Sequence, residues 1–429
     1  MTKTHASNRG GHMRHAVSRR GIIAGTVAAA AALVAKPRLG DAEGASGDAL
    51  TIPPWETQPG SPVLAAPYGA PSPFEKTVIR RPRAHVEVKT DLSSISLTPL
   101  QNLDGIITPS GLHYERHHAG VPAIDPEAYR LVVHGLVKRP LIFTMDDLAC
   151  FPSESRLHFL ECSGNTQNWT AGKPDWTVQD THGLLSCSEW TGVKLSTILD
   201  EVGIDRSAKW ILAEGADAAS MTRSVPIAKA LDDALLVYAQ NGERLRPEQG
   251  YPVRLLLPGF EGNVSVKWLR RLKIGAAPFE TREETSKYTG LLPNGKARQF
   301  AFIMEAKSVI TRPSGGLKLS KPGFHEITGL AWSGRGKIVR VDVSVDGGKS
   351  WHAARLQAPV LDKCLTRFRF PWHWDGGPAT LQSRAIDSTG YVQPTHDQLV
   401  AARGLQSYYH YNGIQSWSVA AGGAVSYAA

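Results

Sequence analysis

Val339-Arg-Val-Asp-Val-Ser-Val345, followed directly by Asp346-Gly347-Gly348, is the most informative stretch of the sequence for the fold. Its apolar and polar residues alternate, as in a strand with one buried face, and Asp-Gly is typical of a tight hairpin turn. A second such strand, Arg384-Ala-Ile-Asp387, also ends before a glycine turn. Helix signals are absent from about Phe300 onward, so we predict an Ig-like β-sandwich over residues 300–429.

Upstream of this region, strand-like and helix-like segments are mixed. Tyr129–His134 and Pro252–Leu257 are rich in Leu and Val, whereas Val193–Glu201 has the apolar spacing of an amphipathic helix. No G-x-G-x-x-G or G-x-x-x-x-G-K-[ST] motif follows a strand, which argues against a doubly wound nucleotide-binding fold. We therefore expect an α+β domain over residues 84–299.

The charge of the chain is concentrated at its N-terminus. Of a formal net charge of +9, residues 1–40 carry +7, because they contain seven Lys or Arg and no Asp or Glu, and +2 remains for residues 41–429. Proteins that bind nucleic acids carry a basic patch in the folded body. We therefore expect no nucleic-acid partner.

Residues 1–45 have the layout of a twin-arginine export signal, in which Arg19-Arg20 precede the uncharged run Gly21–Ala35. We expect this signal to be cleaved and the protein to be exported to the periplasm already folded, which usually implies a cofactor. A membrane anchor is the alternative. The uncharged run is alanine-rich and shorter than the about 20 apolar residues that a spanning helix needs, so we expect no stable membrane span.

Residues 46–83 form a proline-rich arm, with eight prolines between Ile52 and Pro82. This composition favours extended chain over helix. Because the arm is too long for a simple connection, we expect it to run over a domain surface or a neighbouring subunit.

The four cysteines are Cys150, Cys162, Cys187 and Cys364. An exported protein permits disulfides between them without requiring any. The sequence contains no C-x-x-C and no C-x-x-C-H motif, so we expect no haem in this chain and no zinc ribbon.

Two segments are dense in chemically useful residues. Leu160-Glu-Cys-Ser-Gly-Asn165 places Cys162 between an apolar strand and a turn, where a thiol can face a cleft; a buried structural cysteine is the alternative. His113-Tyr-Glu-Arg-His-His118 contains three imidazoles and a guanidinium. An anion pocket fits this segment better than a zinc site, because no H-x-x-x-H spacing is present.

These motifs, with others in the same order, resemble the sulfite oxidase family of molybdenum enzymes from about Ile107 to the C-terminus. The matching motifs are Arg116-His117-His118, Leu160–Asn165, Trp190-Thr-Gly-Val193, Pro252-Val-Arg254 with Pro258-Gly259, and Val266-Lys-Trp268. Several ordered matches are far more specific than any one of them.

The resemblance implies a molybdenum ion held by the dithiolene of one pyranopterin, molybdopterin, with Cys162 as the protein ligand. A thiolate is a soft ligand that suits such a metal. By the same resemblance, Arg116 and Tyr288 are substrate-pocket residues beside the metal. The residues implied to bind the cofactor are Tyr114, Glu115, Arg116, His117, His118, Asp217, Gln249, Arg254, Ser265, Val266 and Lys267. Two alternatives stay open: Arg254 as a surface arm and Tyr288 as an exposed loop residue.

The sequence also departs from the family pattern. Arginines usually follow the cysteine motif, and one of them helps to bind sulfite, whereas this chain has Thr166-Gln167-Asn168. Gln249 stands where a histidine is usual, and an amide can still donate and accept hydrogen bonds. Ile107–His118 and Tyr409–Trp417 resemble the sulfane dehydrogenase branch of the bacterial Sox thiosulfate-oxidising system.

That branch implies a substrate sulfur carried on a cysteine of a sulfur-carrier protein. It also implies a separate c-type cytochrome subunit, which accepts the electrons, and homodimerisation through the C-terminal domain, as in an α2β2 assembly. A free-sulfite dehydrogenase is the close alternative. A methionine sulfoxide reductase fits less well, since that branch of the family lacks the Ig-like extension. A non-catalytic periplasmic protein also fits less well, since it predicts loss of Cys162 or Arg254, and both are present. Arg403 is a further candidate for a residue that reaches the site.

Overall fold

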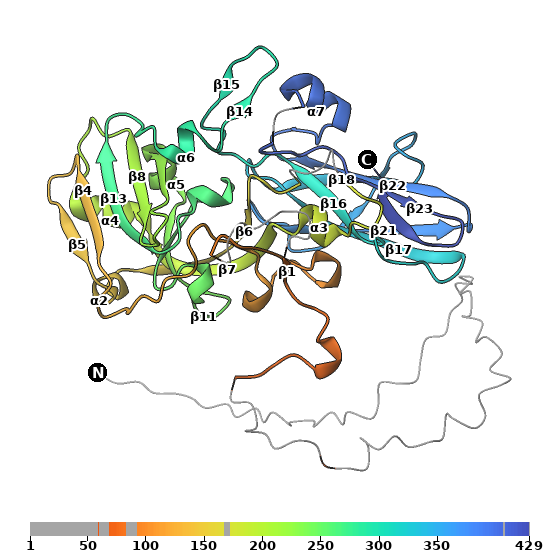
Figure 1. The fold of residues 1–429 in the computed structure, drawn as a ribbon, viewed down its shortest axis with the longest axis horizontal. Coiled ribbons are helices and arrows are strands. Elements are labelled where there is room, and N and C mark those ends of the chain that lie inside the picture. Colours follow the sequence, from red (N-terminus) through yellow and green to blue (C-terminus); the bar gives the residue numbers. More distant parts are fainter. Residues whose placement is uncertain (1–58, 60–67, 83–91, 167–171, 406–407, 429) are drawn as a thin grey trace, which may run out of the picture. The chain divides into compact units, whose positions relative to one another are not determined.

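The computed structural model describes residue 59 and residues 68–82, 92–166, 172–405 and 408–428. The expected signal of residues 1–45, much of the proline-rich arm, and Gln167 and Asn168 lie outside these residues. Within the described residues, no helix is both long and apolar enough to cross a membrane. Figure 1 shows that most of the regular structure is β-sheet.

A mixed five-stranded sheet lies in the first half of the described chain. In spatial order its strands are β5 (Leu141–Phe143), β4 (Leu131–Gly135), β13 (Leu269–Gly275), β8 (Trp210–Gly215) and β9 (Thr222–Pro226). The pair β4 and β13 is parallel, and the other pairs are antiparallel. Leu131 and Ile211 from this sheet are fully buried with Ile198 of helix α4 (Leu195–Val202) in one hydrophobic core. Burial of this apolar face is what holds α4 against the sheet.

A second sheet carries the cysteine motif. Its strands are β11 (Glu243–Arg244), β10 (Leu235–Gln240), β7 (Leu185–Lys194) and β6 (Ser153–Glu161), and β12 (Arg254–Leu256) also pairs with β10. The long antiparallel pair β6 and β7 runs in continuous register from Ser153 opposite Val193 to Glu161 opposite Leu185. Cys162 therefore follows directly on a strand whose position is set by nine residue pairs.

A small sheet brings the arm next to the histidine-rich segment. Its strands are β1 (Arg81–Pro82), β2 (Ile95–Leu97) and β3 (Glu115–Arg116), and both pairings are antiparallel. In the sequence, a short 3-10 helix at Pro73–Glu75 precedes β1, and two more, at Leu100–Asn102 and Ser110–Leu112, lie between β2 and β3. The end of the proline-rich arm is thus hydrogen-bonded into a sheet that contains Arg116.

Two antiparallel sheets form the predicted sandwich. One has the order β16 (Lys307–Arg312), β17 (Gly323–Trp332), β21 (Thr366–Trp374) and β20 (Arg355–Leu356). The other has the order β19 (His352–Ala353), β18 (Ile338–Ser344), β22 (Ala379–Asp387), β23 (Ser416–Val419) and β24 (Val425–Ala428). Their hydrophobic core also includes Phe159 of β6 and Cys187 of β7. The Sγ atoms of Cys187 and Cys364 lie 3.5 Å apart as two thiols in this core.

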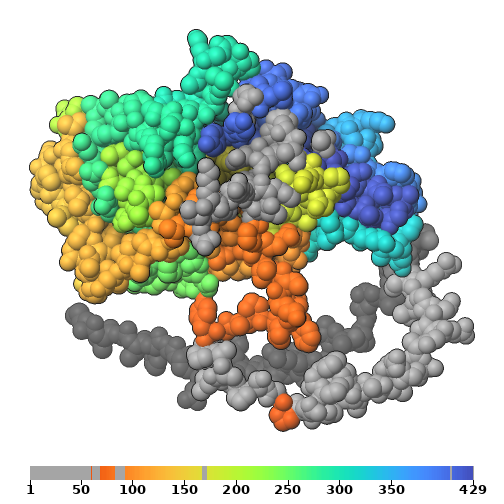
Figure 2. Space-filling view, in the orientation of Figure 1, coloured from red at the N-terminus to blue at the C-terminus, as the bar shows by residue number. Residues whose placement is uncertain are grey.

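The remaining elements are short. The helices are α2 (Met145–Ala149), α3 (Val178–His182), α5 (Ile227–Asp232), α6 (Arg282–Thr285) and α7 (His396–Arg403), with 3-10 helices at Pro247–Gln249 and Gly262–Val264. The hairpin of β14 (Gly290–Leu291) and β15 (Ala297–Arg298) stands out at the top of Figure 2. Pro293 in its turn lies close to Gly404, the residue after α7, so a larger side chain at position 404 would press against Pro293.

The structure agrees with the strand predictions and corrects two helix predictions. The alternating stretch at 339–345 lies in β18 and its downstream turn, and Arg384–Asp387 lies in β22. The helix expected at Val193–Glu201 begins two residues later, because Val193 and Lys194 still pair in β7. The expectation of no helix after residue 300 is wrong, since α7 lies there with a capping box formed by Thr395 and Gln398.

Candidate active site

Cys162 is held in a turn that is fixed on both sides. Its backbone N–H donates to Leu184 O at 3.0 Å, and its carbonyl accepts from Asn165 N at 2.8 Å. The Asn165 side chain accepts from Leu184 N at 3.2 Å and donates to Glu161 Oε1 at 2.9 Å. Cys162 itself is half-buried and lines a cleft.

This cleft has a volume of about 560 Å³, including the part that opens to solvent. Ten of the residues predicted for the site line it: Tyr114, Arg116, His118, Cys162, Gln249, Arg254, Ser265, Val266, Lys267 and Tyr288. Residues from the small sheet, from β12 and from the loop after β6 thereby meet at one place. The structure thus brings together segments that are more than 150 residues apart in sequence.

The cleft wall carries basic side chains. Arg116, Arg254 and Lys267 line the cleft, whereas no Asp or Glu does among the described residues. Within the same residues, none of these three cations has a carboxylate within 4.0 Å. A cation that is removed from water without an anion is costly, so this wall is suited to an anionic ligand.

Arg254 illustrates how these cations are fixed. The side chain is 3% exposed, which rules out the surface-arm alternative. Its guanidinium donates to Gln249 O at 3.1 Å and to Ser265 O at 3.0 Å, and stacks on the Trp190 ring with its carbon 5.2 Å from the ring centre. These contacts orient the group without neutralising it. Burial lowers the pKa of Arg254 to about 10, so it remains charged at neutral pH.

The imidazoles of the histidine-rich segment are neutral. Burial, reinforced by nearby cations, lowers the pKa values of His113, His117 and His118 to about 3. His117 Nδ1 lies 2.9 Å from Lys267 Nζ and accepts a hydrogen bond from it, so in the neutral imidazole His117 Nε2 carries the hydrogen and donates to Glu115 Oε2 at 2.7 Å. The positive charge of the predicted anion pocket therefore comes from the arginines, and from Lys267 when its amine is protonated.

Three predicted residues lie behind the cleft wall. Glu115 and His117 support Lys267 through the hydrogen-bonded chain just described, and Lys267 Nζ also donates to Arg116 O at 3.2 Å and Glu248 O at 3.0 Å. Burial lowers the pKa of Lys267 well below its ordinary value, and the charge of buried Asp217 opposes this fall. Glu115, His117 and Asp217 are thus placed to act through Lys267.

Tyr288 also lines the cleft. It is half-buried, which excludes the exposed-loop alternative, and burial raises its pKa. Its hydroxyl lies 3.5 Å from His118 Nε2, and its ring lies against Tyr409, with 5.3 Å between ring centres. The φ of +55° is strained for a large side chain, so surrounding contacts must hold it there.

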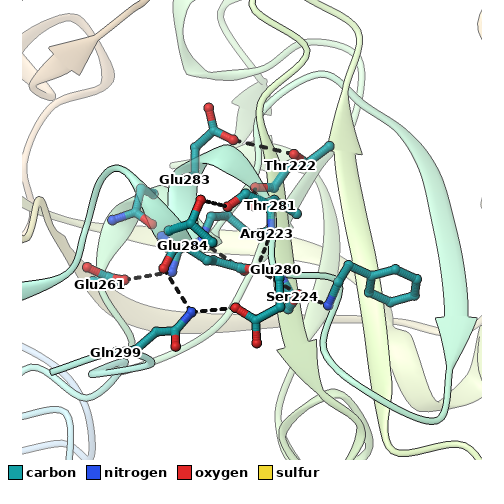
Figure 3. Close-up of polar contacts among 12 residues, drawn as sticks. Thr222, Arg223, Ser224, Glu261, Glu280, Thr281, Glu283, Glu284 and Gln299 are labelled. Carbon is teal, nitrogen blue, oxygen red and sulfur yellow. Dashed lines mark hydrogen bonds and ion pairs between the residues drawn. The ribbon is translucent and has the colours of Figure 1, made fainter. Parts of the chain in front are cut away.

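A buried ion network lies against Tyr288. Figure 3 shows Arg223, Glu261 and Glu284, which belong to this network. The Arg223 guanidinium lies 5.2 Å from the centre of the Tyr288 ring, donates to Glu261 Oε1 at 3.0 Å and lies 3.4 Å from Glu284 Oε1. Glu261 also accepts from His410 Nε2 at 3.1 Å, and Glu284 accepts from Ser224 Oγ at 2.9 Å. Arg403 donates to His410 O at 2.7 Å, and it is not among the described residues that line the cleft.

Comparison with known proteins identifies the family. The family model "Oxidoreductase molybdopterin binding domain" matches residues 118–283, and "Mo-co oxidoreductase dimerisation domain" matches residues 298–416. Sulfite oxidase of Gallus gallus is 33% identical over 321 residues, which are 67% of this chain and 68% of that protein. The chain belongs to the sulfite oxidase family. Mitochondrial sulfite oxidase of Mus musculus is 31% identical over 355 residues, and the matched chain spans 64% of its length.

A solved member of the family matches more completely. The crystal structure of the sulfane dehydrogenase SoxCD from Paracoccus pantotrophus superposes with a TM-score of 0.86 at 48% sequence identity, covering 88% of this chain and 97% of that chain. The predicted resemblance and the predicted fold class, a molybdopterin domain followed by a dimerisation domain, are confirmed. The comparisons also support a molybdopterin oxidoreductase that acts on sulfur compounds.

The cleft of this sulfite oxidase family member fits molybdopterin. Among the described residues, three buried polar atoms on its wall have no hydrogen-bond partner in the protein: Arg254 Nε, His113 Nε2 and Asn263 Oδ1. Buried polar atoms of this kind are ordinarily paired. A phosphorylated, heterocyclic cofactor offers both an anion for the cations and polar ring atoms for the amide and imidazole. Gln249, in place of the family's usual histidine, donates to Tyr114 O at 3.1 Å and still lines the cleft.

Sequence reasoning missed Arg80. This residue forms an ion pair with Glu115, lies 3.6 Å from Glu248 and donates to His113 O at 3.2 Å. It therefore reinforces the layer behind Lys267. Its position at the end of a proline-rich segment concealed it, because that composition predicts an arm rather than part of a site. Asn263 and Met221 of the cleft wall were missed as well, and no local pattern singles them out.

Proposed function

We propose that this protein is the molybdenum subunit of a periplasmic sulfane dehydrogenase. It oxidises a sulfane sulfur carried on a cysteine of a sulfur-carrier protein and passes the electrons to a c-type cytochrome. The observation that carries this proposal is the 48% identity with sulfane dehydrogenase SoxCD over 97% of that chain. The cationic cleft beside Cys162 supplies the matching site.

Each predicted site residue has a role in this proposal. Cys162 provides the thiolate ligand, and Arg254 and Lys267 hold the cofactor phosphate by charge-assisted hydrogen bonds. Arg116 binds the anionic part of the substrate, and Tyr288 orients the reacting group through its hydroxyl. When bound, the molybdenum cofactor supplies two-electron redox chemistry and oxygen-atom transfer.

The electrons leave through a second protein in this proposal. Substrate oxidation releases two electrons, whereas a cytochrome accepts one at a time, and the sequence has no C-x-x-C-H motif for its own haem. The dimerisation domain at residues 298–416 supports a homodimer of molybdenum subunits, with one cytochrome for each. The twin arginines at positions 19 and 20 support export to the periplasm in the folded state.

A free-sulfite dehydrogenase is the second candidate. It is favoured by the 33% identity with Gallus gallus sulfite oxidase and by Arg116, which lines the cleft. The residues after Asn165 argue against it, because Thr166 and Gln167 provide no cation for a small dianion.

One assay separates the two candidates. The molybdenum-loaded protein is incubated with cytochrome c and free sulfite as the sole donor, with Cys162→Ala as the blank. Rapid turnover that depends on Cys162 would establish a sulfite dehydrogenase. We expect negligible turnover with sulfite and Cys162-dependent reduction of cytochrome once a persulfide-bearing carrier protein is supplied. Turnover of the Cys162→Ala protein equal to that of the wild type would contradict both.

A further inference from the structure

Glu161, the residue directly before Cys162, is bound by side chains of the C-terminal sandwich. Its Oε1 accepts from Lys307 Nζ at 3.0 Å, and its Oε2 accepts from Trp332 Nε1 at 2.6 Å. Lys307 begins β16 and Trp332 ends β17. Glu161 and Trp332 are 0% exposed and Lys307 is 1% exposed. A carboxylate beside the cleft cysteine is thus neutralised by a different sheet from the one that carries it.

The same lysine reaches the other side of the cysteine. Lys307 Nζ donates to Thr166 Oγ1 at 2.9 Å, and Asn165 Nδ2 donates to Glu161 Oε1 at 2.9 Å. The ammonium group therefore connects the residue before Cys162 to the residue four positions after it. With these contacts both Glu161 oxygens and the lysine are hydrogen-bonded. The residues on both sides of Cys162 are therefore bound to the sandwich.

Stability alone does not account for this arrangement. A buried ion pair stabilises a fold little more than apolar residues of similar size, because both charges must lose their hydration. An ion pair with hydrogen bonds also fixes the relative position and orientation of its two side chains, because these bonds form only over a narrow range of geometries. A ligating group needs its supporting contacts to hold it to within about 0.5 Å. The hydrogen bonds of Glu161 to Lys307 and Trp332 lie directly beside Cys162, where a metal ligand would need such precision.

We propose that Lys307, Glu161 and Trp332 are positioning residues for the Cys162 thiolate, so that the sandwich sets the geometry of the metal ligand. This inference rests on the proposed role of Cys162 as the metal ligand. The C-terminal domain then has a function in the site of its own chain, in addition to any contact between subunits.

The test is Lys307→Met, which keeps the length of the side chain and removes its charge. Molybdenum and pterin content, the electron paramagnetic resonance spectrum of the reduced metal, kcat and KM are measured for the full chain. The rate at which iodoacetamide alkylates Cys162 in the cofactor-free protein is followed by peptide mass spectrometry. The matched control is Lys363→Met, which breaks another ion pair between distant segments, 2.6 Å from Lys363 Nζ to Asp233 Oδ2, with side chains that are 18% and 10% exposed. The backbone of Lys363, which accepts from Phe159 N, is unchanged in this variant.

We expect Lys307→Met to shift the metal spectrum, to lower kcat by about 10- to 100-fold with KM nearly unchanged, and to change the alkylation rate of Cys162. Lys363→Met should retain the wild-type spectrum and alkylation rate, even if it unfolds at a lower temperature. A Lys307→Met protein with wild-type spectrum, kcat and alkylation rate would overturn the inference.

Two further variants keep the test decisive if Lys307→Met does not fold. Glu161→Gln combined with Lys307→Met leaves no unpaired charge, and Trp332→Phe removes only one donor. A positioning role predicts that both fold but keep an altered spectrum, whereas full recovery in both would overturn it. Cys162→Ala separates the two proposals: if it retains the wild-type metal spectrum, the ligand assignment itself fails; if only the Lys307 variants are normal, the ligand assignment stands and the positioning role fails.

Discussion

The cations on the cleft wall differ from the cations buried behind it. Arg116, Arg254 and Lys267 face the cleft, and none of them has a carboxylate within 4.0 Å in the described part of the chain. Arg223 and Lys307 lie one layer deeper, and each is paired with a buried carboxylate, Arg223 with Glu261 and Lys307 with Glu161. The same residue types thus occur in two electrostatic states within one site.

The presence or absence of a carboxylate partner distinguishes cations that stabilise the fold from cations that are suited to bind an anionic ligand. A paired ion keeps its partner in every state, so its contribution is present before the cofactor binds. A charge that has no carboxylate partner in the protein is compensated fully when an anion binds. Paired and unpaired cations should therefore respond in opposite ways to mutation and to added anions.

The largest effect is expected for Arg223→Met in the cofactor-free protein. It leaves Glu261 and Glu284 without their shared cation, so the free energy of unfolding should fall by about 3–5 kcal/mol in chemical denaturation. Arg139→Met, at an exposed ion pair with Glu201, should change it by less than about 1 kcal/mol. The comparison breaks down if Arg254→Met destabilises the cofactor-free protein as much as Arg223→Met does.

Next in size is the effect of Arg254→Gln on cofactor retention. Loss of charge-assisted hydrogen bonds, each worth about 1.5–3 kcal/mol, should weaken cofactor binding by about 10- to 100-fold. The pterin content of the purified protein, measured by fluorescence after release, should fall accordingly. Arg335→Gln, which removes a cation already paired with Glu305, should retain the wild-type content. Equal loss in both variants would count against a special role for the unpaired cations.

A moderate effect is expected from added anions. Inorganic pyrophosphate should raise the unfolding temperature of the cofactor-free protein by a few degrees, because a ligand that binds only the native state stabilises it. Arg254→Gln should respond much less. Calorimetric scans over a pyrophosphate series, with sodium chloride at matched ionic strength, provide the measurement. A rise of the same size in sodium chloride would show that only general screening is involved.

The smallest effect concerns the pH dependence of the paired layer. Burial alone would raise the pKa of Glu261, but the His410 hydrogen bond and the Arg223 charge outweigh it and lower the value from 4.5 to about 2. The native state then binds this proton less readily than the unfolded state, so the stabilisation is complete above about pH 4.5 and is lost as the pH falls toward 2. Denaturation at several pH values should show a steeper decline for the wild type than for Glu261→Gln. Parallel curves would contradict the assignment.

Short motifs explain why much of the site was predictable. Arg116, Cys162, Arg254 and Lys267 each lie in a contiguous stretch that resembles the family, and the structure places all four on the cleft wall. β18 was predictable from the alternation of its sequence, and Val341 and Val343 are buried as that pattern predicts. The alternation does not hold along the whole strand, since Val339 is exposed and Asp342 is buried. These motifs and strands are encoded by residues that are close together in the sequence, so they can be predicted from a single sequence.

The remainder depends on contacts between distant segments. Lys307 lies 146 residues from Glu161, and nothing around either residue indicates the partner. Arg80 was hidden by the proline-rich composition around it. Helix α7 is only weakly amphipathic, although its Thr395-His-Asp-Gln398 capping box is a signal that could have located its start.

The hydrogen bonds of Lys307 and Trp332 to Glu161 have an evolutionary consequence. The segments matched by the two family models, residues 118–283 and 298–416, look like modules that recombination could exchange. A chimera that takes residues 298–416 from a relative combines the cysteine turn of one protein with the sandwich of another, and these two parts have not evolved together. Positions 161, 307 and 332 should therefore covary among relatives, and grafting them together should restore a chimera that fails without them.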